Sequence, residues 1–267
     1  MAGPRIISAV HQGVAFEQRA LRLLEENLSM SLRRVGGKSD GGVDLLGWWW
    51  LPPLRNSNID NCGAPVTPHP ENHYRHQQLS PSSTKRTRLR ILAQCKAEKK
   101  KTAPKYIREL EGVTARLSSS QSSSSTFPVV SLFVSESAFT RAAILRAHSS
   151  AFPFFLLHIP PLAPRALESN GNMNGDTERD ASGHDLDDGE IGTALWNPAL
   201  SRILGDRMQV RWERGDNLQS TTSSGRPAVW HQPEEGPWER LRNWTPESDV
   251  MQEDDEEFAD KVKAGMQ

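Results

Sequence analysis

Two apolar runs separated by a proline-rich stretch constrain the fold of this chain more than any other feature. Residues 43–51 read VDLLGWWWL and residues 89–96 read LRILAQCK. Runs that are apolar on both faces are typical of central strands covered by helices on each side. Residues 52–87 contain six prolines among Asn, Ser and His, so we interpret them as an inserted loop rather than as core. We expect the two runs to pair, since closing a long loop costs only logarithmically more entropy.

The other elements alternate in the same way across residues 8–160, which we predict to form one domain. Apolar residues at helical spacing predict helices over residues 13–28, 104–117 and 137–148. Further strands are predicted over residues 31–35, 128–134 and 152–159. A serine-rich linker over residues 118–126 interrupts this order. The order α-β-β-β-α-β-α-β predicts an α/β fold with a mixed central sheet flanked by helices.

The remainder of the chain carries weaker signals. Residues 161–195 are rich in Gly, Asn and Asp and are predicted to be a disordered linker. Within residues 196–214 we expect a short helix over 196–204 and an edge strand over 208–212, both added to the core. Residues 215–236 read as loop. Residues 215–267 as a whole are predicted to be a mostly disordered acidic tail, with its acidic run at 249–257.

Charge is divided unevenly along the chain. The first 160 residues carry 21 Lys and Arg against 11 Asp and Glu, a balance of +10, whereas the rest carry 11 against 22, a balance of -11. This asymmetry indicates a polyanion partner for the first part. No apolar run approaches the length of a membrane-spanning helix. Two cysteines exclude a disulfide scaffold and a four-cysteine zinc site.

The candidate catalytic residues lie where the two apolar strands are expected to meet. Gln94 and Lys96 are two positions apart, so their side chains point to one face while Cys95 points to the other, where we expect it to be buried. If the strands are antiparallel, Asp44 lies beside Gln94 and Lys96. A carboxylate, an amide oxygen and the intervening backbone carbonyl are hard oxygen ligands that suit Mg²⁺ or Mn²⁺.

Lys96 then has two candidate roles: it orients or deprotonates the attacking water, or it neutralises charge in the transition state. Glu17, on the first helix, is expected to reach the same site and hold a metal-bound water or a second metal. Asp40 is less suited as a ligand, because it precedes two glycines.

A basic segment follows the second strand directly. Its side chains, together with those before the strand, are expected to form a rim that contacts phosphates: Lys99, Lys100, Lys101, Lys105, Arg86, Arg88 and Arg90. A solvated charged face is the alternative interpretation. Trp48, Trp49 and Trp50 can stack on bases, but burial in a central strand is the role we expect.

Several motifs resemble those of the Mrr-like branch of the restriction-endonuclease-like nucleases. They are G-x-x-F-E at 13–17, D-G-G-V-D at 40–44, Q-C-K at 94–96, IRELEGV at 107–113 and FVSESAFT at 133–140. The resemblance covers residues 8–160 and implies metal-dependent phosphodiester chemistry, with Asp44, Gln94 and Lys96 in the motif positions and Glu17 in the helix position. Gln94 stands where many related nucleases carry a carboxylate, although Mrr-like proteins also use glutamine.

A closer resemblance is to the fungal mitochondrial "required for respiratory growth" family, in which the Mrr-like domain stands alone. It rests on RVGGKSDGGVD at 34–44, WLP at 50–52 and RELEG at 108–112. This family resemblance implies a mitochondrial location, whereas residues 1–16, with Arg5 and no acidic residue, are short and poor in arginine for a transit peptide.

Taken with the candidate site, these resemblances imply a mitochondrial Mg²⁺- or Mn²⁺-dependent endonuclease that acts on DNA and is needed for respiratory growth and maintenance of the mitochondrial genome. Two alternatives remain open. One is a catalytically inactive factor that binds DNA or RNA on the same fold. The other is a protein-interaction module that uses the acidic run 249–257, which could equally shield the basic face.

Overall fold

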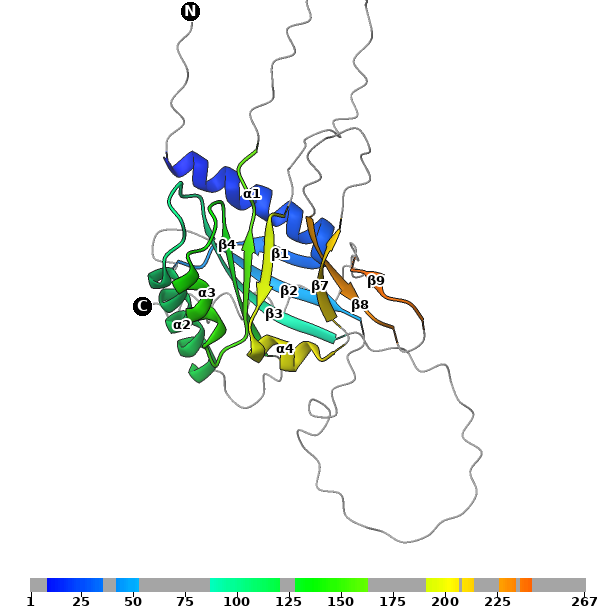
Figure 1. The fold of residues 1–267 in the computed structure, drawn as a ribbon. Coiled ribbons are helices and arrows are strands. Elements are labelled where there is room, and N and C mark those ends of the chain that lie inside the picture. Colours follow the sequence, from blue (N-terminus) through cyan, green and yellow to red (C-terminus); the bar gives the residue numbers. More distant parts are fainter. Residues whose placement is uncertain are drawn as a thin grey trace, which may run out of the picture.

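A computed structural model describes the chain over residues 9–35, 42–52, 87–120, 128–162, 191–206, 208–213, 226–233 and 236–241. These residues form two sheets and four helices (Figure 1). The larger sheet contains β1 Met30–Arg34, β2 Leu45–Leu51, β3 Thr87–Lys96, β4 Val129–Ser135, β5 Phe154–His158 and β6 Thr193–Trp196. The helices are α1 Ala9–Leu28, α2 Pro104–Ser120, α3 Arg141–His148 and α4 Pro198–Leu204. The smaller sheet contains β7 Met208–Glu213, β8 Arg226–His231 and β9 Glu239–Arg240.

The larger sheet is mixed and follows chain order from β1 to β6. β2 runs antiparallel to both of its neighbours, β1 and β3. The next three strands, β3, β4 and β5, are parallel to one another, and β6 is antiparallel to β5. The predicted α/β class, the order of the first eight elements and the mixed sheet are confirmed. β2 and β3 pair as expected, with Leu45 opposite Ala93.

Each face of this sheet has its own apolar core. On one face α1 packs Phe16 and Leu24 against Trp49 and Phe155, whose rings stack with centroids 5.5 Å apart. The opposite face is covered by α2 and α3, which lie together in Figure 1 away from α1. All four apolar residues that predicted α2 are buried there: Ile107, Leu110, Val113 and Leu117. Helical spacing places them on one stripe, so the helix forms by burying that stripe.

The tryptophan run of β2 is buried, as we expected. Trp48 and Trp49 are fully enclosed and Trp50 is 8% exposed. The guanidinium groups of Arg88 and Arg90 lie 4.4 Å and 4.3 Å from the centroid of the Trp48 ring. These side chains therefore cover Trp48 through cation–π contacts.

Several expectations about boundaries were wrong. α3 begins after Thr140, whose side chain caps the Ala143 N–H, and not at Ser137. α2 continues to Ser120, into the serine tract. Met208–Glu213 does not add an edge strand to the main sheet, because it pairs with β8. β8 itself lies within residues 215–236, for which the sequence predicts a loop.

The smaller sheet and β6 extend the core on the α1 face. Met208 and Val229 belong to the same apolar cluster as α1, and the Arg240 guanidinium donates to Asn27 of α1 at 3.1 Å. No helix in the described ranges combines the length and apolar character that crossing a bilayer requires. Four of the predicted segments lie wholly or largely outside the described residues: the proline-rich residues 53–86, residues 121–126 of the serine-rich linker, residues 163–190 of the second linker and the acidic run 249–257.

Candidate active site at the carboxyl edge of the parallel strands

The candidate residues lie where the three parallel strands end. Lys96 of β3, Ser135 of β4 and His158 of β5 are in register, so these ends form one edge of the sheet. β2 runs the other way and begins at this edge, which brings Asp44 to it. Ligand sites of open α/β sheets commonly lie outside the carboxyl ends of such strands.

Asp44 is fixed directly to β3. Its N–H donates to the Ala93 carbonyl at 2.9 Å, and its Oδ2 accepts a hydrogen bond from the Cys95 N–H at 2.6 Å. Gln94 lies alongside, because a Cβ at Gly42, where φ is +83°, would come within 2.8 Å of Gln94 Nε2. The expected meeting of these two distant stretches is therefore confirmed.

Cys95 lies on the opposite face from Gln94 and Lys96, packed against the α1 core. Burial raises the pKa of the Cys95 thiol well above its ordinary value, and the carboxylates of Asp44 and Glu17 raise it further. The thiol is therefore protonated at neutral pH and is not an activated nucleophile. The same interactions indicate that Asp44 and Glu17 both lie close to Cys95.

Glu17, on α1, lies on the Cys95 side of the sheet, as one half of an ion pair. The Arg34 side chain donates from Nε and Nη2 to Glu17 Oε2 at 2.8 Å and 2.7 Å. Charge-assisted contacts of this kind restrain both side chains. Sequence reasoning missed Arg34, since its partner lies 17 positions away on another element.

Lys96 is also paired. Its Nζ lies 3.2 Å from Glu98 Oε1 and 4.9 Å from the centroid of the Tyr106 ring. The Tyr106 hydroxyl donates to the Glu98 carboxylate, 2.9 Å from each oxygen. Burial works to raise the pKa of Glu98, but the Tyr106 hydrogen bond and the Lys96 charge outweigh it, so the pKa is lowered.

The basic segment after β3 is anchored to the next strand. Thr102 Oγ1 lies 2.6 Å from Ser135 Oγ, and the Thr102 N–H donates to the Ala138 carbonyl at 3.1 Å. Lys99, Lys100, Lys101 and Lys105 are exposed on this supported segment. Lys105 Nζ lies 4.5 Å from the centroid of the Tyr106 ring, which Lys96 also contacts.

Arg88 does not share a rim with these lysines. It precedes Lys96 by eight strand residues, which corresponds to about 26 Å, and its guanidinium covers Trp48. The lysines therefore gather at one end of β3, and Arg88 and Arg90 lie at the other. Arg86, like Asp40, lies outside the described residues.

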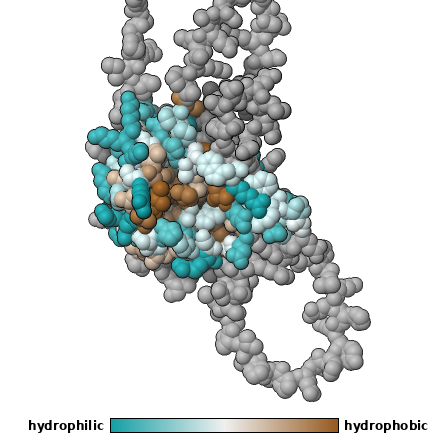
Figure 2. Space-filling view, in the orientation of Figure 1, coloured by the Kyte–Doolittle hydropathy of each residue, from teal (hydrophilic) through white to brown (hydrophobic). Residues whose placement is uncertain are grey.

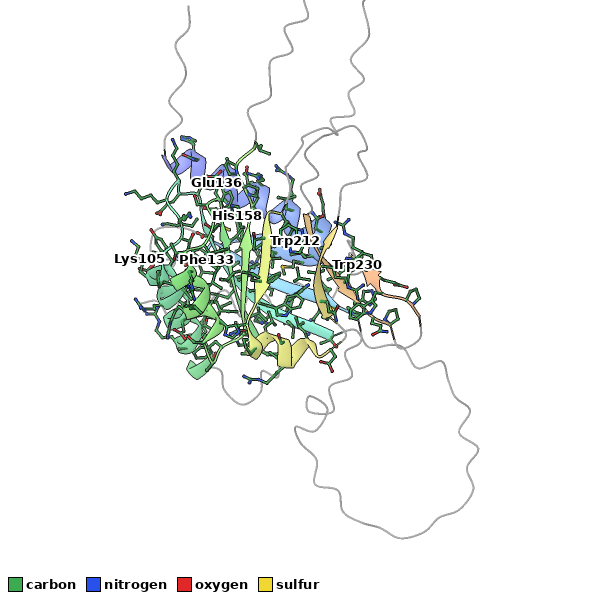
Figure 3. The ribbon with its side chains drawn as sticks, in the orientation of Figure 1. Lys105, Phe133, Glu136, His158, Trp212 and Trp230 are labelled. Carbon is green, nitrogen blue, oxygen red and sulfur yellow. The ribbon has the colours of Figure 1, made fainter. Side chains whose placement is uncertain are left out.

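Two further polar residues share the edge and were missed from the sequence. The His158 ring hydrogen-bonds to the backbone of Glu136, and Figure 3 shows both residues at the same end of the sheet. Burial lowers the pKa of His158, so the ring is largely neutral at neutral pH. Their placement follows only from the parallel register of β3, β4 and β5.

The donor set at this edge fits a hard divalent cation in chemical type: the Asp44 carboxylate, the Gln94 amide oxygen and nearby backbone carbonyls. Within the ranges that the structure describes, no group of three His, Cys, Asp or Glu side chains is placed to hold a metal ion. A metal site at this edge would thus depend on the Asp44 carboxylate together with neutral oxygen ligands.

The fold and this edge define an α/β protein with a mixed sheet whose carboxyl edge gathers a carboxylate, an amide and a lysine. The family model described as "Required for respiratory growth protein 7" matches residues 8–203, so the chain belongs to that family. No solved structure matches this chain.

The curated relatives carry the same description and are named as mitochondrial. The Saccharomyces cerevisiae S288c protein is 34% identical over 125 residues, covering 43% of this chain and 52% of the relative. The Candida glabrata protein is 31% identical over 137 residues, covering 46% and 53%. The chain thus spans about half the length of these relatives. Their names place this family, and with it this chain, in the mitochondrion.

Proposed function

We propose that this protein is a mitochondrial metal-dependent DNA endonuclease with a restriction-endonuclease-like core. The observation that carries the proposal is the contact of Asp44 Oδ2 with the Cys95 N–H at 2.6 Å. It joins the DGGVD and QCK motifs at one sheet edge, although they are 51 positions apart. The requirement for respiratory growth named in the relatives is consistent with a role in maintaining the mitochondrial genome.

In this proposal Asp44 and Gln94 hold Mg²⁺ or Mn²⁺, with help from the Cys95 carbonyl. When bound, the cation supplies Lewis-acid activation of the phosphodiester. Lys96 shares the face of Gln94 and donates hydrogen bonds to the phosphate oxygens, where negative charge builds in the transition state. Glu17, released from Arg34, orients water. The exposed lysines over 99–101 contact neighbouring phosphates.

Cleavage of a DNA panel tests this function. The full chain with Mg²⁺ or Mn²⁺ should cut duplex, branched or single-stranded DNA, because the cation and Lys96 together stabilise the transition state. Asp44→Ala and Lys96→Ala should each slow cutting by about a hundredfold or more, the cost of removing one stabilising group. Glu109→Ala, at an exposed position of α2, should leave the rate unchanged.

The enzyme proposal would fail if no DNA of the panel were cut and if Asp44→Ala and Lys96→Ala both restored respiration to a deletion strain.

The favoured alternative would then be a non-catalytic nucleic-acid-binding factor. Pairing of Glu17 with Arg34 supports this second candidate, since that carboxylate already has a partner. Such a factor would bind with a steep salt dependence and no need for metal. Asp44→Ala would leave its affinity unchanged or raise it.

A further inference from the structure

The Lys96 ammonium group lies within a small cluster of side chains that the endonuclease proposal does not use. Glu98 follows Lys96 by two residues, and Tyr106 lies on the first turn of α2. A carboxylate oxygen of Glu98 is 3.2 Å from Lys96 Nζ, and the face of the Tyr106 ring is presented to the same ammonium at 4.9 Å. Two independent contacts therefore act on one group.

The carboxylate of Glu98 is itself held in place. The Tyr106 hydroxyl is 2.9 Å from both of its oxygens, a geometry that fixes the plane of the carboxylate. The Ser137 hydroxyl donates to the Glu98 backbone carbonyl, so the chain around Glu98 is tied to the segment that follows β4. Restraint of this kind reduces the conformational freedom that an ion pair between long side chains would otherwise lose.

Tyr106 is anchored in turn by the core. Its ring contacts Phe133 of β4, with centroids 6.2 Å apart. A continuous series of contacts therefore runs from the buried sheet through Tyr106 and Glu98 to the ammonium of Lys96. Catalytic groups need this support, because displacement by about 1 Å can cost about a hundredfold in rate.

We propose that Glu98 and Tyr106 are positioning residues that hold the Lys96 ammonium at the carboxyl edge of the sheet. This inference rests on the proposed function for its catalytic consequence, but the positioning itself is independent of any reaction. Tyr106 fixes Glu98 through its hydroxyl and contacts Lys96 through its ring, whereas Glu98 supplies the opposing charge. The Glu98 carboxylate is charged at neutral pH, as a glutamate is at its ordinary pKa of 4.5, and the direction of its pKa shift is downward.

NMR of the lysine ε-methylene groups in the full chain tests the positioning without any activity. A proton close to the face of an aromatic ring is shifted upfield, so the Lys96 signal, identified by its loss in Lys96→Arg, should lie upfield of those of the exposed lysines 99–101. Lys105 is not part of this reference, because its Nζ is 4.5 Å from the centroid of the same Tyr106 ring. Glu98→Gln and Tyr106→Leu should both move the Lys96 signal toward those of lysines 99–101. Glu109→Gln, an exposed change of the same chemistry on α2, should not. A Lys96 signal that coincides with the exposed lysines in the unaltered protein, or moves in neither variant, overturns the proposal.

Cleavage kinetics test the consequence. Tyr106→Phe keeps the ring packed on Phe133 and removes only the hydroxyl, so it should fold normally. In a protein that cuts DNA, Tyr106→Phe and Glu98→Gln should each lower kcat about tenfold and leave KM within about twofold. Unchanged rates overturn the proposal, as do faster rates, which would mean that Glu98 competes with phosphate for Lys96. If the unaltered protein does not cut, the endonuclease proposal fails and the NMR result alone decides the positioning.

Discussion

Single residues at the carboxyl edge divide into those that sequence reasoning could place and those that it could not. Gln94 and Lys96 follow from strand periodicity, and Asp44 follows once β2 and β3 pair antiparallel. Arg34 and Tyr106 could not be foreseen, because each acts on a partner carried by a different element. Such contacts depend on the angle at which helices meet the sheet, which no local pattern encodes.

His158 makes the stability of the fold depend on pH. Burial lowers its pKa from the ordinary 6.5, so between 6.5 and the folded value the unfolded chain binds more protons. The contribution of His158 to the free energy of unfolding should therefore be fully present above pH 6.5 and be lost as the pH falls below it. Burial likewise lowers the pKa of His231, which acts in the same direction.

Urea unfolding between pH 7.5 and 5 measures this dependence. His158→Asn removes one titrating group, so its free energy of unfolding should fall less steeply with decreasing pH than that of the unaltered protein. Equal slopes for His158→Asn and the unaltered protein would show that the His158 pKa is not lowered.

Among the elements, the strongest constraint is the close approach of β1 to β2 at Gly47. Its φ is +154°, and a Cβ there would lie 2.1 Å from the Ser31 carbonyl oxygen. Gly47→Ala should therefore destabilise the protein by about 2 kcal/mol or more, since backbone atoms must move.

Gly112 provides the opposite case in α2. It is exposed, and nothing lies within 4 Å of a Cβ placed there. Gly112→Ala should stabilise by about 0.5–1 kcal/mol through helix propensity. Thermal or urea unfolding of both variants tests whether Gly47→Ala destabilises the protein and Gly112→Ala stabilises it. A stabilised Gly47→Ala variant would contradict the observed register of β1 on β2.

The length and apolar periodicity of each element explain why some helices and strands were predicted from the sequence and others were missed. α1, β2, β3 and α2 are long, and their apolar patterns match the faces that they bury. β6 and β9 are short, with four and two residues, and give no usable period. β7 was recognised as a strand but assigned to the wrong sheet, because periodicity reports that a segment is extended and not which strand it pairs with.

For the whole molecule, Asn197 shows that the segment after the linker is part of the main fold. It is 2% exposed and caps α4, with Oδ1 accepting from the Leu200 N–H at 3.0 Å. Its other hydrogen bonds join α4 to β5 and to the end of α3: from the Phe154 N–H, and to the carbonyls of Ala147, Ser150 and Phe152. The family match likewise extends to residue 203, within α4.

Asn197→Ala should consequently cost about 2–4 kcal/mol, because it leaves several buried backbone groups without partners. Asn27→Ala is a suitable control, since Asn27 is only partly buried and makes hydrogen bonds to Leu23 and Arg240. Its loss should be about 1 kcal/mol. Comparable losses in urea unfolding of the two variants would mean that the segment from β6 to α4 is not integral to the core.

The most direct measurement on the central claim is the position of a divalent cation in crystals soaked with Mn²⁺. The account predicts an anomalous peak at the carboxyl edge, with oxygens of Asp44 and Gln94 about 2.0–2.3 Å from the ion, as hard cations require, and with Lys96 facing the same space. Crystals of the Asp44→Ala variant should lack that peak. A cation bound only elsewhere, or no cation at Asp44 at saturating Mn²⁺, would contradict the account.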